Sequence, residues 1–427
     1  MRSAVVAAAV LLLGAGWPAA SHDARRTGQS DVRGPRSAER TASVILTAEQ
    51  NINMAVTIAD DGTVYAGTWG VVRSGGSSDV ASWNKFDGKL FAFHRSLEPR
   101  WTAPLDRVPY CYLSMAHVVF AAPALSPDEK TVYVAGAWGP RVDAWETTLR
   151  GAIYALDAAT GALKWTFEPV NEAVWWKPTV WTTELAAGTD GTLYAAGTEL
   201  TFGGGSAVVF ALRDQGDRAS YAWPRMIDID LDHSVLANGL ALRETGGVTR
   251  RVYATSGDGY SHLLQGYDRG GKLVAIEASS GSLLWSFDPE THGGTGAMTG
   301  IAIDAEGVVY TGVSGRRDGG RLFAIREDGS LLWQFTLGGL LEWAHPVLGP
   351  RGDLYAGDSR RCLLNAYPVE SGICSAVSID PRVYVVWKRS PRTPPCESGI
   401  DASQARVGAV KSSRSSTDRA PSGPAPA

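Results

Sequence analysis

Residues 154–165 read YALDAATGALKW, and two later stretches of the chain repeat the same order of residue types. Residues 274–285 read VAIEASSGSLLW and match it position for position, and residues 323–333 read FAIREDGSLLW with one residue fewer in the middle. Each stretch predicts a strand with a small Ala, a tight turn at Gly, and a second strand that carries Trp. Self-similarity of this kind indicates a fold built from copies of one unit.

The rest of the unit is marked by Tyr. Several of these Tyr residues follow a short apolar strand and a turn such as Asp61-Gly62 or Asp190-Gly191, where Gly takes the positive φ that a tight turn requires. The Tyr landmarks are Tyr65, Tyr133, Tyr194, Tyr253, Tyr310 and Tyr355. The sixth copy departs from the others, because Cys374 stands where Trp is expected.

The pattern predicts an all-β chain, a β-propeller of four-stranded antiparallel blades. One Trp per unit is interpreted as a plug between adjacent sheets, since a buried indole removes about 150–250 Å² from water. These residues are Trp101, Trp165, Trp223, Trp285 and Trp333. We count six repeats, and seven or eight blades stay possible, with candidate strands at residues 43–47 and 382–388. A solenoid or a sandwich is the alternative, but the Trp spacing is long for solenoid repeats.

The form Ala-x-Asp-x-x-Thr-Gly-x-x-x-Trp at residues 155–165 resembles the docking motif of pyrroloquinoline-quinone (PQQ)-type propellers. The resemblance covers about residues 54–379. It implies a quinoprotein-like propeller in which each Trp locks one blade to the next. The same repeat occurs in quinone-dependent dehydrogenases and in non-catalytic relatives such as the propeller subunit of the outer-membrane assembly machinery. The chain is most similar to the non-catalytic branch.

The ends of the chain differ from its middle. Residues 1–21 combine a basic start, an apolar run and a small-residue site, and so predict a signal peptide. Export to the periplasm or the medium is expected, with no transmembrane span. Residues 22–42 are interpreted as a flexible lead-in and residues 43–389 as the propeller. The Pro- and Ser-rich residues 390–427 are predicted to be a disordered tail.

Charge and cysteine content limit the classes of partner. The formal net charge is −4 and no basic face is visible, so a nucleic-acid partner is not predicted. The four Cys residues allow three disulfide pairings, which the sequence does not distinguish. No Cys lies near the predicted cleavage site, and a lipoprotein anchor is therefore not predicted. A monomer is expected.

Four His residues lie shortly before the first strand of a repeat, and Trp176 lies at the comparable place in the third. If the first strand of each blade is innermost, these side chains approach the mouth of the central channel. Converging imidazoles bind metals or anions. The alternative is a set of unrelated histidines that bind backbone groups. The candidate residues are His117, Trp176, His233, His292 and His345.

Three carboxylates alternate at Asp228, Asp230 and Asp232, which predicts one acidic strand face. Such a face is either a hard-cation site or simply a solvated surface. The Gly-rich residues 292–296 are not followed by a helical pattern, so they do not predict a phosphate cradle.

The sequence contains no recognisable catalytic set. The dehydrogenases that it resembles use calcium-bound PQQ, an Asp base and two adjacent Cys, but this chain has no adjacent Cys pair. No cofactor is therefore predicted, and whether the protein is an enzyme stays undecided. The leading hypothesis is a non-catalytic binding or scaffold module for a protein or an extracellular ligand. The alternative is a PQQ- or metal-dependent oxidoreductase with its site at the channel mouth.

Overall fold

The computed structural model describes Asp23 and residues 55–68, 89–105, 118–119, 121–138, 150–172, 180–201, 204–230, 235–258, 270–313, 320–337, 345–348, 354–358, 363–367 and 383–385. The predicted signal peptide and tail lie outside these residues, as does the lead-in apart from Asp23. Those three boundaries therefore stay predictions.

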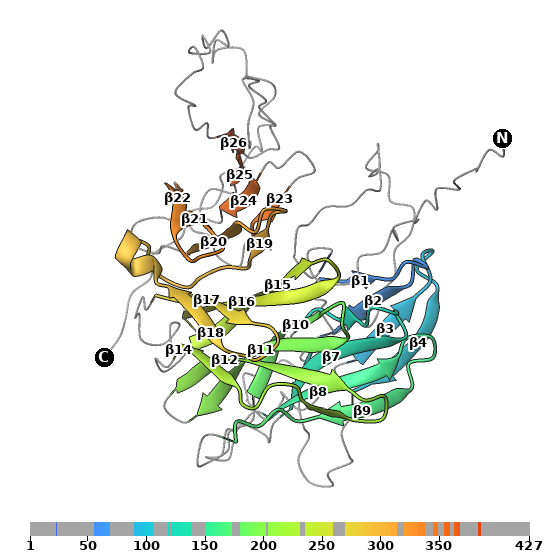
Figure 1. Ribbon diagram of the computed structural model, residues 1–427. Coiled ribbons are helices and arrows are strands. Elements are labelled where there is room, and N and C mark those ends of the chain that lie inside the picture. Colours follow the sequence, from blue (N-terminus) through green and yellow to red (C-terminus); the bar gives the residue numbers. More distant parts are fainter. Residues whose placement is uncertain are drawn as a thin grey trace, which may run out of the picture. The chain divides into compact units, whose positions relative to one another are not determined.

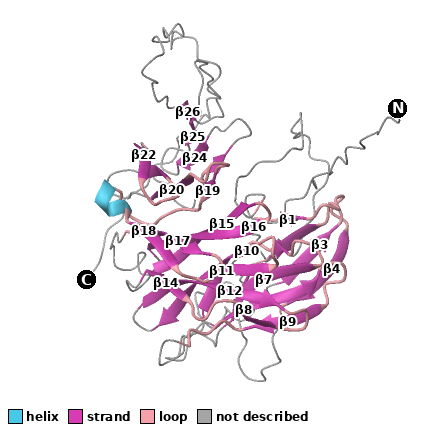
Figure 2. Cartoon of the chain, in the orientation of Figure 1, coloured by secondary structure: helices cyan, strands magenta, loops and turns pink. Residues whose placement is uncertain are grey.

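Strands make up most of the described chain, and the one helix drawn within it is the short 3-10 helix η2 (Pro289–His292) (Figure 2). The described strands form six sheets, each from one stretch of chain with its strands in chain order (Figure 1). The prediction of an all-β chain with four-stranded antiparallel repeats is confirmed, and each of the six repeats corresponds to one sheet.

The strands of each sheet have the following bounds. The first sheet contains β1 (Thr57–Ile58), β2 (Val64–Gly67), β3 (Lys89–Phe93) and β4 (Pro99–Pro104). The second contains β5 (Val118–Val119), β6 (Ala124–Leu125), β7 (Thr131–Trp138), β8 (Arg150–Asp157) and β9 (Leu163–Phe167). The third contains β10 (Val180–Ala187), β11 (Thr192–Thr201), β12 (Gly204–Asp214), β13 (Ala219–Tyr221) and β14 (Ile227–Asp230).

The later sheets follow the same order. The fourth contains β15 (Val235–Thr245), β16 (Val248–Asp258), β17 (Leu273–Glu277) and β18 (Leu283–Phe287). The fifth contains β19 (Ala302–Ile303), β20 (Val309–Val313), β21 (Arg321–Ile325) and β22 (Leu331–Thr336). The sixth contains β23 (Val347–Leu348), β24 (Leu354–Asp358), β25 (Leu363–Tyr367) and β26 (Val383–Val385).

The Tyr, Ala and Trp landmarks lie side by side across each of the first five sheets. In the fourth sheet Tyr253 pairs with Ala275, which pairs with Trp285 on the next strand. The small Ala leaves room for the indole ring to lie beside the Tyr ring, with centroids 5.8 Å apart. Centroid separations of 5.8 to 6.0 Å recur in the pairs Tyr65–Trp101, Tyr133–Trp165, Tyr194–Trp223 and Tyr310–Trp333.

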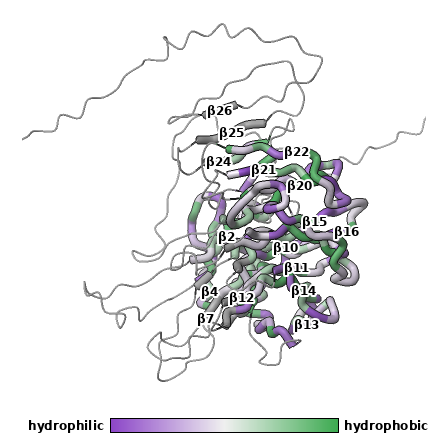
Figure 3. The backbone as a smooth tube through the Cα atoms, turned by 90° about the vertical axis from the view of Figure 1, so that its left-hand side faces the viewer, coloured by the Kyte–Doolittle hydropathy of each residue, from purple (hydrophilic) through white to green (hydrophobic). Residues whose placement is uncertain are grey.

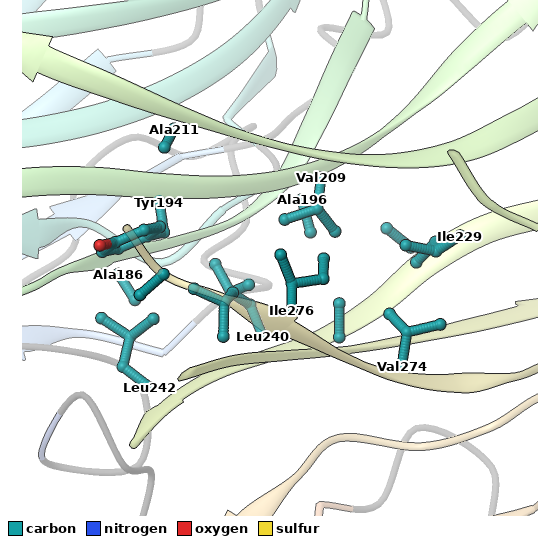
Figure 4. Close-up of a cluster of buried hydrophobic side chains, with 14 of the residues drawn as sticks. Ala186, Tyr194, Ala196, Val209, Ala211, Ile229, Leu240, Leu242, Val274 and Ile276 are labelled. Atoms are coloured by element: carbon teal, nitrogen blue, oxygen red, sulfur yellow. The ribbon is translucent and has the colours of Figure 1, made fainter. Parts of the chain in front are cut away.

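Successive sheets pack face to face, as the blades of a β-propeller do. Five clusters of buried hydrophobic side chains each take their members from two consecutive sheets. Figure 4 shows the cluster between the third and fourth sheets, in which Val209 and Ile229 lie opposite Val274 and Ile276. Hydrophobic and hydrophilic stretches accordingly alternate along the chain, with hydrophilic residues in the turn beside β13 (Figure 3).

Four of the indole rings also contact the following sheet through a hydrogen bond. The indole Nε1 of Trp223 donates to the carbonyl oxygen of Ala278 over 2.8 Å. Trp101 donates in the same way to Ala158, at 3.1 Å, and Trp285 to Glu327, at 3.0 Å. Trp165 instead donates to the carboxylate of Asp214, over 2.8 Å. Ala158, Ala278 and Glu327 lie in the turn that joins the last two strands of the next sheet, and Asp214 is the last residue of β12, just before the turn to β13.

A glycine lies under three of these rings. A Cβ atom at Gly281, where φ is +73°, would meet Cδ2 of Trp223 at 2.8 Å. Gly161 and Gly329 lie in the same way against Trp101 and Trp285. Two reasons require glycine at these positions: the backbone is left-handed, and the indole leaves no room for a side chain.

The Tyr hydroxyls at the sheet junctions differ in their hydrogen bonds. Tyr65 donates to the carbonyl oxygen of Ala158 over 3.0 Å. At the junction of the fourth and fifth sheets, the equivalent carbonyl of Glu327 accepts from Trp285 and from Arg251. The buried hydroxyl of Tyr253 makes no hydrogen bond there.

This difference predicts unequal effects of two matched substitutions. Tyr65→Phe loses a hydrogen bond and is expected to lower the free energy of unfolding by about 1 kcal/mol. Tyr253→Phe removes a buried polar atom that has no partner, so it is expected to be neutral or stabilising. Urea denaturation of both variants measures the two effects. An equal loss in both would show that the Tyr253 hydroxyl is bonded in solution.

Three sheets depart from the simple pattern. In the third, β12 pairs with both β13 and β14, so its outer strand is interrupted at residues 222–226, which contain Trp223. In the second, β5 and β6 both pair with β7. In the sixth, β26 pairs with β25 in parallel and lies within the candidate strand predicted at residues 382–388. Residues 43–47 and Cys374 lie outside the described chain, so closure of the propeller and its blade number stay predictions.

Candidate functional site

Each sheet has one regular and one irregular end. Because neighbouring strands are antiparallel, the connections between first and second strands lie at the same end as those between third and fourth strands. We call this the turn end, and none of its described connections exceeds five residues: 59–63, 94–98, 126–130, 158–162, 188–191, 215–218, 246–247, 278–282, 304–308 and 326–330. We call the opposite end the irregular end. Its connections vary in length, from the short one at residues 202–203 to the long one at residues 68–88.

The turn end is held by local hydrogen bonds of Asp side chains. Asp61 accepts from the backbone N–H of Thr63 at 2.8 Å, and Asp190 accepts from that of Thr192 at 3.0 Å. These bonds lower the pKa of Asp61, with the Thr63 hydroxyl as the largest cause. Their repetition explains the residue types at this end as turn chemistry.

The two described histidines of the predicted channel-mouth group contact different parts of the irregular end. The His292 ring stacks on Phe287, with centroids 5.0 Å apart and an interplanar angle of 5°. His345 lies against Gly300, where a Cβ atom would meet its Nδ1 at 1.9 Å. Gly300 comes just before the first strand of the fifth sheet, whereas Phe287 ends the last strand of the fourth.

His117, Trp176 and His233 lie outside the described residues. The shared ligand site of these five side chains therefore stays a prediction. The structure places His292 and His345 at the irregular end, without showing a common partner for them.

The predicted acidic face is divided by a β-bulge. Asp228 is paired with Val208, but Asp230 is paired with Ala207, the neighbouring residue of β12. The two carboxylates therefore lie on opposite faces of the sheet, and the alternation expected from the sequence does not hold for them. Asp228 is at the surface on the side of the second sheet, and Asp232 lies outside the described chain.

Asp230 is engaged with the fourth sheet. Its side chain is almost fully buried, its Oδ2 accepts from the Ser256 hydroxyl at 3.0 Å, and its Oδ1 lies 3.8 Å from Nζ of Lys272. A buried carboxylate with an ammonium and a hydroxyl beside it is satisfied without a metal ion. Its contacts fasten β14 to β16 and β17 at the irregular end.

A second buried acid, Glu199, was not found by sequence reasoning. It lies near the end of β11, is 3% exposed, and accepts a hydrogen bond from the side-chain amide of Asn171. Burial raises its pKa, the Asn171 amide opposes this rise, and the Asp228 carboxylate adds to it. A Glu among the small and apolar residues of a central strand is the signal that could have marked it.

The raised pKa predicts how stability depends on pH. The native state binds the Glu199 proton more tightly than the unfolded state, whose value is near 4.5. The contribution is therefore complete below that value and is lost as the pH rises toward the native pKa. Glu199→Gln keeps an oxygen for Asn171 without the charge. Its free energy of unfolding should exceed that of the wild type by a margin that grows with pH above about 4.5 and then levels off.

Denaturation of both proteins between about pH 4 and about pH 8 measures this margin. Asp217→Asn, which removes an exposed carboxylate at the turn end, is the control against which the margin of Glu199→Gln is compared. A flat difference for Glu199→Gln would contradict the prediction.

Part of the repeat region matches a known protein family. The family model described as outer membrane protein assembly factor BamB matches residues 251–366. This segment contains the Tyr and Trp landmarks of the fourth and fifth sheets and Tyr355 of the sixth. The repeats of this segment are of the PQQ type. No curated protein matches the sequence significantly.

Several solved structures match the chain at low identity. BamB from Moraxella catarrhalis is 17% identical over 73% of this chain and 81% of its own, with a TM-score of 0.35. Quinohemoprotein alcohol dehydrogenase from Comamonas testosteroni is 13% identical over 80% and 76%, with a TM-score of 0.37. An inactive virginiamycin B lyase from Staphylococcus aureus is 11% identical over 77% and 87%, with a TM-score of 0.43. At these identities the likeness concerns the fold alone.

The donor set that calcium-bound PQQ needs is not assembled in the part of the chain that the structure describes. No group of three or more His, Cys, Asp or Glu side chains there is arranged to hold a metal ion. Asp230, the more buried of the two predicted acidic residues that the structure describes, contacts Lys272 and Ser256.

Proposed function

We propose that the protein is an exported, non-catalytic β-propeller that binds a protein or an extracellular ligand through the irregular end of its sheets. The main support for this proposal is the contrast between the turn end and the irregular end of the sheets. The turn end repeats the same short, locally bonded connections, whereas the irregular end differs from repeat to repeat and carries Glu199, Asp228, His292 and His345. Variable connections on a rigid scaffold are where binding residues concentrate.

Export is proposed from the predicted signal peptide at residues 1–21. In the described residues, no helix is long and apolar enough to cross a membrane. N-terminal sequencing of protein recovered from the periplasm or the medium should begin close to residue 22. Recovery of the uncleaved chain from the cytoplasm alone would count against export.

A protein is the favoured ligand. The family model that matches residues 251–366 is described as an outer membrane protein assembly factor, which supports a role in binding other proteins. A component of an envelope assembly complex is one form of this proposal, and it predicts that outer-membrane proteins are among the partners.

Part of the proposal concerns the scaffold itself. We infer that Trp101, Trp165, Trp223, Trp285 and Trp333 dock each blade on the next, as in the motif that they resemble. The hydrogen bonds of the first four to the following sheet support this role.

Site-specific photo-crosslinking in cells tests which end binds. A photo-reactive side chain is introduced at Asp228 or Thr291, exposed at the irregular end, and at Asp217 or Ser279, exposed at the turn end. Covalent adducts are expected from the first pair and not from the second. Adducts from the turn-end positions alone would overturn the assignment of the binding face.

The oxidoreductase alternative is tested separately. Purified protein is mixed with PQQ, calcium and an artificial electron acceptor in the presence of primary alcohols. No turnover above the protein-free mixture is expected. Reproducible turnover that His292→Ala or His345→Ala abolishes would overturn a non-catalytic function.

A further inference from the structure

One turn of the first sheet differs from its counterparts at a single important position. Residues 91–101 read FAFHRSLEPRW and align without a gap with residues 323–333 of the fifth sheet, FAIREDGSLLW. The strand pairing is also the same, because Ala92 pairs with Trp101 as Ala324 pairs with Trp333. In this alignment Leu97 stands where the fifth sheet has a glycine, Gly329.

The backbone of the turn is nevertheless the same. The amide of Leu97 donates to the carbonyl oxygen of His94 over 2.8 Å, and the amide of Gly329 donates to that of Arg326 over 2.9 Å. Leu97 has a φ of +67°, and Gly329 has a φ of +88°. A leucine rarely adopts this left-handed backbone, so its side chain is expected to do something that a glycine cannot.

In the other sheets the glycine at this position makes room for the indole ring of the preceding sheet. A Cβ atom would lie 2.6 to 2.9 Å from the ring in the pairs Gly161–Trp101, Gly281–Trp223 and Gly329–Trp285. The first sheet carries a whole leucine side chain at the equivalent position. An indole therefore cannot dock on the first sheet in the way that it docks on the others.

The side chain of Leu97 packs on the face of the first sheet that points away from the second sheet. It lies against a cluster formed by Ala66, Phe91 and Phe93. The cluster is buried, although no other described sheet contributes to it. The face is therefore covered within this chain, which favours a segment of the chain itself over a separate partner. The equivalent residues of the fourth sheet belong to the cluster shared with the preceding sheet: Ala254, Val274 and Ile276.

The sixth copy of the repeat lacks the residue that such a glycine would accommodate. Cys374, which lies outside the described residues, stands in the sequence where Trp is expected. Five clusters join the six sheets in chain order, so one face remains at each end of the series. The missing indole and the missing glycine belong to these two faces. Both absences have one explanation if the two faces meet, since a leucine beside a cysteine replaces an indole above a glycine.

We propose that the sixth copy of the repeat packs against this face of the first sheet, with the Leu97 side chain in place of the docking indole. The chain then forms a ring of six blades whose last junction pairs Leu97 with Cys374. This inference concerns the scaffold, and it does not depend on the proposed binding function.

The native Cys374 allows a direct test in the full chain. In a variant with Cys111, Cys362 and Cys396 replaced by Ser, Leu97→Cys introduces the second of two thiols. A disulfide needs Cβ atoms about 3.5–4.5 Å apart, so it forms readily only if position 374 faces the turn. Mild oxidation is expected to join residues 97 and 374 within one chain in most molecules. Non-reducing electrophoresis and peptide mass spectrometry measure the yield and identify the bond.

Ser96→Cys in the same background is the matched control, because Ser96 is exposed in the same turn and should stay unpaired. A disulfide between two chains at residue 97 would assign the face to a second copy of the protein and overturn the proposal. The absence of a bond in Leu97→Cys, or an equal yield in Ser96→Cys, would also overturn it.

A double-mutant cycle tests the same junction without a disulfide and with the other cysteines intact. Cys374→Trp alone forces an indole against Leu97, and Leu97→Gly alone leaves a gap. Together they restore the indole and glycine of the other junctions. The double variant is expected to have a folding equilibrium constant about tenfold above the product of the single effects, measured by urea denaturation. Glu98→Gly with Cys374→Trp is the control pair and should show no coupling. No coupling in either pair would refute the contact between Leu97 and Cys374.

Discussion

Replacement of Trp223 by Ala is expected to lower the free energy of unfolding by about 3–5 kcal/mol, the usual cost of removing a buried Trp. The side chain is 3% exposed, lies beside the Tyr194 ring, and donates to the carbonyl of Ala278 in the next sheet. Its loss opens a cavity between two sheets and leaves that carbonyl without its donor. Urea denaturation followed by tryptophan fluorescence and circular dichroism measures the change.

Trp223→Phe separates the two contributions, since it keeps an aromatic ring between the sheets but removes the indole N–H. Its effect should be smaller than that of Trp223→Ala by about half or more, because most of the loss comes from the cavity. If Trp223→Ala costs less than about 1 kcal/mol, the indole does not hold the sheets together in solution.

The second large effect is expected at the glycine beneath this ring. Gly281→Ala places a methyl group 2.8 Å from Cδ2 of Trp223 and forces a non-glycine residue into a left-handed backbone. The backbone contribution is about 1–2 kcal/mol, and overpacking adds about 1–3 kcal/mol. Gly191→Ala is the matched control, because φ is +80° there and nothing lies within 4 Å of the new atom.

The difference between Gly281→Ala and Gly191→Ala measures the contact with the indole. The double variant Trp223→Ala with Gly281→Ala should be less destabilised than the sum of the single variants, because the ring that clashes has been removed. Strict additivity, or equal losses in the two glycine variants, would show that the turn moves away from the indole.

Much of this architecture could be predicted from the sequence, because each landmark is set by short-range chemistry. A Gly in a tight turn fixes the pairing of the two strands beside it, so Ala275 and Trp285 lie opposite each other whatever the rest of the chain does. The same register recurs between Ala92 and Trp101, Ala155 and Trp165, and Ala324 and Trp333. The Trp-to-Tyr ring contacts follow from that register.

The residues of the candidate site could be predicted less well, because their contacts are long-range. Alternation places Asp228 and Asp230 together, but the bulge opposite β12 separates them, and nothing in the local sequence marks it. Glu199 accepts its hydrogen bond from Asn171, which comes from the connection between two sheets. Arg321 meets His292 across a sheet boundary. Each of these contacts depends on how two repeats pack against each other, whereas the sequence pattern describes a single repeat.

Five of the six buried hydrophobic clusters of the described chain are each shared by only two neighbouring sheets, and this has a consequence for how such a chain can change. A substitution within one cluster is felt by one pair of sheets, and most cluster members lie on strands, although Met298, Ile301 and Leu337 come from connections at the irregular end. Lineages of this protein can therefore lengthen, shorten or exchange those connections one at a time while the scaffold keeps its stability. The residues proposed to bind a partner lie at one end of the strands, and the residues that stabilise the fold lie along them. The two sets can therefore evolve at different rates.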